Sequence, residues 1–187
     1  KTIPVARKTI TAPMFGPRYK EVEIESEELK GKVYYLVSGH GGPDPGAMAH
    51  RVDGKYTLCE DEYAYDVTLR LARRLMANGA TVHMVVEDGN DGIREEMYLD
   101  CDNDEKSMGR STIPVSQKLR LRQRTNEINK LYKKHKKQGV KDQVVFSIHV
   151  DSRSASQRQD VFFYYYSESN SGKALADQLK NTFHQKY

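Results

Sequence analysis

Short apolar segments alternate along this chain with longer segments of helical spacing, and this alternation restricts the fold more than any other feature. The apolar segments are rich in β-branched and aromatic residues, so we predict strands at residues 33–38, 81–86, 143–149 and 160–166. Apolar residues that recur every three or four positions predict helices at residues 60–78, 116–138 and 170–187. Strands that alternate with helices favour an α/β fold with a mostly parallel central sheet and helices on both faces.

The segments outside this pattern suggest how the chain is organised. Residues 1–30 contain prolines, glycine and an acidic stretch, so we expect a linker or an N-terminal extension there. Residues 31–187 are expected to form one domain, because a chain of this length can bury a sizeable core. Residues 87–114 show no periodicity and are long for a plain connection, which predicts a functional or variable surface excursion.

Composition excludes two classes of partner. The net charge is only +4, and the basic residues between 118 and 141 fit the solvated face of a helix. No zinc-finger spacing or RNA-binding signature accompanies them, so we expect no nucleic-acid partner. We also expect no membrane span, because every apolar run is far shorter than the roughly 18 residues that a bilayer requires.

The two cysteines give little information about the redox environment. Cys59 and Cys101 do not form a C-x-x-C motif. They could pair in an exported protein and would be free thiols in the cytosol. We expect no bridge between them.

Histidines stand at the ends of two predicted strands. His40 follows the strand at 33–38 and opens a loop of glycine and proline, whereas His149 ends the strand at 143–149. Sites form at the carboxyl edge of a parallel sheet, and the helix that begins at Glu60 starts at that edge. We therefore expect Glu60 beside both imidazoles. Two histidines and one carboxylate, with water as the fourth ligand, are a known catalytic zinc environment.

Other interpretations of these residues stay open at this point. A histidine at a strand end also serves as a structural group, and acids in a first helical turn are also favoured by the helix dipole. Asp61 and Glu62 stand beside Glu60 in that turn, and Cys59 could act as a thiolate ligand. The local pattern alone does not select one acid.

Four segments of the chain form a recognisable series. They are "VYYLVSGHGGPDPGAM", "EDEYAYDVTLRLARRLMANGATV", "LRLRQRTNEIN" and "VVFSIHVDS", in this order. Together they resemble the zinc-dependent N-acetylmuramoyl-L-alanine amidases of the Amidase_3 type. The resemblance lies in the GHGG loop, the glutamate-led helix, Arg124 and Asn129 of the third segment, and the S-x-H element. It extends from about Lys32 to the end of the chain.

This resemblance implies a reaction and a set of ligands. The reaction is hydrolysis of the amide between the lactyl group of N-acetylmuramic acid and L-alanine of the peptidoglycan stem peptide. The implied cofactor is Zn²⁺, held by His40, Glu60 and His149, and the implied partner is peptidoglycan. Such a substrate implies a bacterial cell-envelope location, either periplasmic or extracellular.

The resemblance also has departures and gaps. We expect Asp44, His50 and Asp151 to lie near the substrate. Asp44 is also expected to brace its loop. Asp151 stands where the family has asparagine. The family's catalytic glutamate would lie beyond Tyr187, which implies that this domain is C-terminally incomplete and leaves its general base unknown. The alternative functions are a catalytically inactive zinc- or peptidoglycan-binding module of the same fold, or another zinc peptidase.

Overall fold

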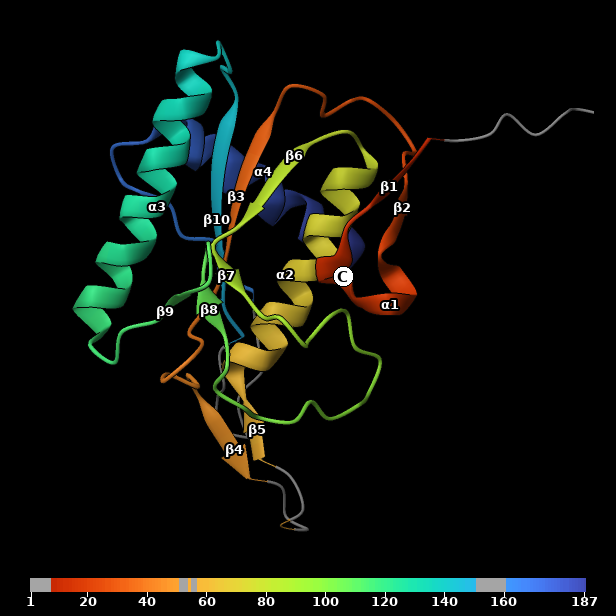
Figure 1. Cartoon of the computed structure of the whole chain (residues 1–187). Coiled ribbons are helices and arrows are strands. Elements are labelled where there is room, and N and C mark those ends of the chain that lie inside the picture. The colour runs from red at the N-terminus through yellow and green to blue at the C-terminus, as the bar shows by residue number, and fades with distance from the viewer. Residues whose placement is uncertain (1–7, 51–53, 55–56, 151–160) are drawn as a thin grey trace, which may run out of the picture. The chain divides into compact units, whose positions relative to one another are not determined.

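The computed structural model describes residues 8–50, 54, 57–150 and 161–187. It divides the chain into two compact units, Lys1–Ser152 and Arg153–Tyr187. Figure 1 shows the elements of both units. The expected substrate residue Asp151 lies outside the described residues.

A three-stranded parallel sheet forms the centre of the first unit (Figure 1). Its order is β10 (Gln143–Ile148), β3 (Val33–Ser38) and β6 (Thr81–Met84). Ser38 at the end of β3 pairs in register with Ile148 at the end of β10, so the carboxyl ends of these strands are adjacent. The prediction of an α/β fold with a parallel sheet is confirmed.

Two long helices cover the sheet, α2 (Glu60–Ala77) and α3 (Gln117–Lys137), and Figure 1 shows them on its two sides. Successive side chains of a strand point to opposite faces. Accordingly, Leu36 of β3 belongs to a core that includes Leu69 of α2, whereas its neighbour Tyr35 belongs to a second core against Ile128 of α3. Because successive side chains of β3 point to opposite faces, this strand packs against both helices.

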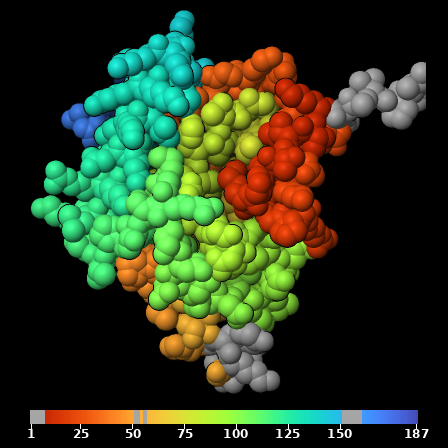
Figure 2. Space-filling model, in the orientation of Figure 1, coloured from red at the N-terminus to blue at the C-terminus, as the bar shows by residue number. Residues whose placement is uncertain are grey.

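The N-terminal segment forms short secondary-structure elements and contributes residues to the core. It forms β1 (Thr9–Thr11), η1 (Pro13–Phe15), α1 (Gly16–Tyr19) and β2 (Glu21–Glu23), and β1 pairs with β2 in antiparallel fashion. Phe15 and Val22 are fully buried in the core on the α2 side, and Figure 2 shows this segment in red against later parts of the unit. These two residues are therefore part of the core, a contribution that the prediction of a linker or N-terminal extension for residues 1–30 did not include.

The acidic excursion after β6 is also partly buried. It contains the short strands β7 (Val86–Glu87), β8 (Lys106–Ser107) and β9 (Ser111–Thr112), which pair in antiparallel order. Leu99 and Ile113 are only 4% exposed. The segment thus supports the core as well as forming surface. A further antiparallel pair, β4 (Met48–His50) with β5 (Thr57–Cys59), precedes α2.

The second unit contains a helix but no strand among its described residues. Helix α4 (Asn170–Lys186) begins after Ser169, whose hydroxyl accepts a hydrogen bond of 3.0 Å from Gly172 N. Residues 161–166 are not a strand, so the strand expected at 160–166 is wrong for its described part. The physical reason is that the described part of this unit offers no neighbouring strand for backbone pairing.

Cys59 and Cys101 form a disulfide bond, and their Cα atoms are 5.7 Å apart. The expectation of no bridge is wrong. Cys59 lies at the start of α2, and the acidic excursion returns to that point. A contact made by a returning segment leaves no mark in the local spacing of the cysteines.

This disulfide should contribute measurably to stability. We expect the double variant Cys59→Ser, Cys101→Ser to lose about 2 to 4 kcal/mol of unfolding free energy, because the bridge restricts the unfolded chain. The two cysteines are 42 residues apart, so the closed loop is substantial. Urea unfolding measures the change. Reductant should destabilise the parent protein similarly and leave the double variant unaffected; equal stability of the two proteins would contradict the expectation.

Candidate functional site

Three side chains predicted to converge do meet at the carboxyl edge of the sheet. His40 stands two residues after β3, His149 directly follows β10, and Glu60 is the first residue of α2. One potential ligand atom from each lies within 4.8 Å of the others. Glu60 Oε2 is 3.3 Å from His40 Nε2, and Glu60 Oε1 is 3.0 Å from His149 Nδ1.

The carboxylate of Glu60 is the buried member of this group, with its side chain only 4% exposed. Two backbone N–H groups donate to it, from Ala47 at 3.0 Å and from Val150 at 3.2 Å. A buried charge requires such partners, because the loss of its hydration is costly. The loop after β3 and the chain after β10 are therefore both fastened to Glu60.

His40 is held on its other side by Asp44. His40 Nδ1 lies 3.1 Å from Asp44 Oδ2, and Arg120 donates to the same oxygen. Arg124 donates to the backbone carbonyl of His40, which adopts a left-handed backbone with φ of 61°. Burial alone would raise the pKa of Asp44, but the hydrogen bond and charge of His40, the Gly46 N–H and Arg120 together lower it. Asp44 thus braces the loop, as expected.

Two glycines leave room for the imidazoles. A Cβ atom at Gly46 would lie 2.7 Å from His40 Cδ2 and 2.8 Å from Glu60 Cβ, and φ there is +70°. A Cβ atom at Gly39 would lie 2.5 Å from His149 Nδ1. Both positions therefore require the close backbone approach that only glycine allows.

The three side chains fit a zinc ion by their chemistry. Imidazole nitrogens and carboxylate oxygens are common zinc ligands, and ligands of one tetrahedral ion lie about 3.3 Å apart. The separations of 3.0 Å and 3.3 Å between Glu60 and the two imidazoles match that spacing. Asp44 also supplies the carboxylate that commonly orients a ligating histidine. The group could hold a metal ion.

The other expected substrate residues differ in their placement. Asp44 lies beside His40, as described above. His50 is exposed in β4, and its Nδ1 lies 3.1 Å from Thr57 Oγ1. It is not a member of the group that could hold a metal. Contact of these residues with substrate stays a prediction.

Further buried acids lie in or contact the segments that carry the site. Glu62 pairs with Arg94 at 2.9 Å, and Glu105 accepts a hydrogen bond of 2.7 Å from Gly42 N in the loop that carries His40. Burial, with the charge of Glu62, raises the pKa of Asp61 to about 6, and burial raises that of Glu105 to about 8. Sequence reasoning did not select Arg94, although it is the single arginine in the acidic stretch 87–105.

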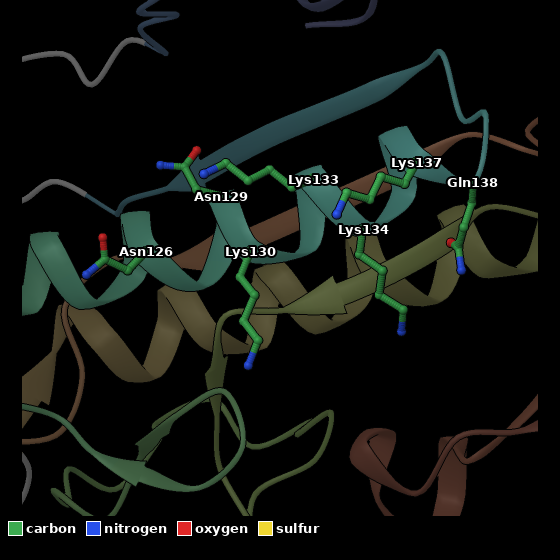
Figure 3. A pocket seen from close by; sticks show the side chains of 7 residues that line it. All are labelled: Asn126, Asn129, Lys130, Lys133, Lys134, Lys137 and Gln138. Atoms are coloured by element: carbon green, nitrogen blue, oxygen red, sulfur yellow. The ribbon is translucent and has the colours of Figure 1, made fainter.

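A depression of about 730 Å³ lies along α3, away from this chemistry (Figure 3). Figure 3 shows its lining residues, which are Asn126, Asn129, Lys130, Lys133, Lys134, Lys137 and Gln138. None of these side chains is a histidine or a carboxylate. The lysines are exposed, as expected for the solvated face of this helix, and we do not place the reaction there.

A glycine substitution tests the geometry of the group. We expect Gly39→Ala to displace the His149 imidazole from Glu60, because the new methyl group would overlap it. Overpacking of this kind costs about 1 to 3 kcal/mol in stability. Histidine-ring NMR and thermal unfolding measure the two effects.

Gly89→Ala is the matched control, because no atom lies within 4 Å of a Cβ there and no strained φ accompanies it. It should leave both signals unchanged. An unaltered His149 ring signal in Gly39→Ala would contradict the described packing.

Comparisons with known proteins place the chain in a family. A family profile described as N-acetylmuramoyl-L-alanine amidase matches residues 35–187. The chain is also similar to the "Probable cell wall amidase LytH" of Staphylococcus aureus, including strains USA300 and NCTC 8325 / PS 47. Each is 26% identical over 162 residues, which is 87% of this chain and 40% of the relative's length. No solved structure gives a significant match. The chain therefore belongs to the N-acetylmuramoyl-L-alanine amidase family.

Proposed function

We propose that this chain carries the zinc centre of a peptidoglycan amidase, with His40, Glu60 and His149 as the metal ligands. The bond cleaved is the amide between the lactyl group of N-acetylmuramic acid and L-alanine of the stem peptide. The observation that carries the proposal is the placement of two imidazoles against one buried carboxylate. Family membership and the cell wall amidases to which the chain is similar support the substrate class.

The residues of the chain prepare the ligands for this role. When bound, zinc would lower the pKa of a water molecule towards about 7 and polarise the scissile carbonyl. If His40 donates its Nδ1–H to Asp44, its Nε2 lone pair, which lies 3.3 Å from Glu60 Oε2, would be free to bind the metal. Glu60 supplies one negative charge, and its backbone donors fix both of its oxygens.

Two acids near the site, Glu62 and Asp44, make structural contacts. Glu62 accepts hydrogen bonds from Arg94 at 2.9 Å and from Asp102 N at 2.9 Å. Asp44 is engaged by His40 and Arg120. A group that transfers the proton must reach the reacting atoms. We therefore assign proton transfer to neither acid.

We further propose a periplasmic or extracellular location in the cell envelope. The disulfide between Cys59 and Cys101 supports it, because such bonds persist mainly in oxidising compartments. The relatives are named as cell wall amidases. None of the helices in the described part of the chain combines the length and apolar character needed to cross a bilayer.

Digestion of purified muropeptides tests the reaction. The natural protein that contains this sequence should release stem peptides with a free L-alanine amine and glycans with a free lactyl carboxylate, as measured by mass spectrometry. His149→Ala should lower this activity by about 100-fold or more, because a lost ligand costs at least as much as a lost outer-shell partner.

His184→Ala is the control and should retain activity, since His184 is exposed in α4, outside the proposed ligand set. Cleavage within the stem peptide would identify another zinc peptidase. Muropeptide binding without cleavage would identify a non-catalytic module. Either result would overturn the proposed function.

A further inference from the structure

A second group of potential metal ligands lies beside the first and is distinct from it. One carboxylate oxygen from each of Asp61, Glu62 and Glu105 lies within 4.8 Å of the others. All three residues are buried, with exposures of 1%, 1% and 3%. They come from separate parts of the chain, the first turn of α2 and the residue before β8. Tertiary folding has therefore brought three carboxylates together out of water.

The positive charge beside this group does not balance three ionised carboxylates. Arg94 pairs with Glu62 at 2.9 Å, and it also pairs with Asp91. Three carboxylates and one shared guanidinium leave a local excess of at least two negative charges if the acids are ionised. Burying uncompensated charge is costly, so such groups are normally paired or bound to a metal.

One oxygen of the group also lacks a partner. Asp61 Oδ1 accepts a hydrogen bond of 3.0 Å from Glu62 N. Asp61 Oδ2 is buried and has no hydrogen-bond partner among the described residues. Since most buried polar atoms in folded proteins are hydrogen-bonded, this unpartnered oxygen points to a ligand that the protein chain does not itself supply.

We propose that Asp61, Glu62 and Glu105 bind a hard divalent cation of the calcium type. The group offers only oxygen atoms, which suit Ca²⁺ better than the nitrogen and sulfur ligands that zinc favours. A divalent ion would favour the ionised form of the three carboxylates, balance their charge and supply the missing partner of Asp61. Asp88 and Asp102 form a neighbouring group with Glu105 and add further negative charge.

The position of the cation gives it a structural role. Glu105 accepts the N–H of Gly42, two residues after His40. Asp61 and Glu62 directly follow Glu60 in α2, and the Cys59–Cys101 disulfide joins the same two segments. A cation would thus fasten the acidic excursion to the loop and helix that present the zinc ligands. This inference does not rest on the proposed amidase reaction.

Calcium titration of the zinc-loaded protein tests the inference, with calorimetry to measure binding and thermal unfolding to measure stabilisation. The expected result is one calcium ion per chain and a rise in the unfolding temperature. Asp61→Asn should lower the affinity by about tenfold or more, because ligand charge sets calcium affinity. This variant should still fold without calcium, since asparagine has nearly the same shape as aspartate and carries no charge that burial would penalise.

Two controls separate this site from others. Asp177→Asn makes the same change at an exposed position of α4 and should bind calcium like the parent protein. His149→Ala removes a proposed zinc ligand and should also retain calcium binding. The inference is overturned if the parent protein binds no calcium at millimolar concentration, if Asp61→Asn binds it as tightly, or if His149→Ala abolishes binding.

Discussion

The buried carboxylate of Glu60 is the constraint around which the site is arranged. Its side chain is 4% exposed, yet it contacts two imidazoles and accepts hydrogen bonds from two backbone N–H groups. These partners come from two stretches of chain, one after β3 and the other after β10. Because a buried charge without partners is strongly unfavourable, these stretches must keep their positions. The glycines at 39 and 46 are the local consequence of that crowding.

The first turn of α2 presents acids in two directions. Glu60 points to the imidazoles, whereas Asp61 and Glu62 belong to the group completed by Glu105. Neighbouring residues of a helix face different ways, so one turn can serve both groups. The positive end of the helix dipole favours all three acids. The disulfide at Cys59 fixes the residue immediately before this turn.

Sequence patterns predicted those parts of the structure that follow from local rules. The β-branched residues of 33–38 and 143–149 predicted strands, and parallel pairing then placed His40 and His149 at one edge. Sequence patterns did not predict contacts between segments that are far apart in the chain. The burial of Phe15 and the Cys59–Cys101 bridge depend on such contacts. Their physical basis is tertiary packing, which leaves no periodic signal in the chain.

Zinc-edge X-ray absorption of the zinc-loaded protein would identify the atoms that bind the metal. Binding by His40, Glu60 and His149 predicts nitrogen and oxygen ligands at about 2.0 to 2.2 Å, including two imidazoles, and no sulfur near about 2.3 Å. In His149→Ala the spectrum of any residual bound zinc should lose one imidazole contribution. A sulfur ligand, or an unchanged imidazole count in that variant, would contradict the assignment of the metal to His40, Glu60 and His149.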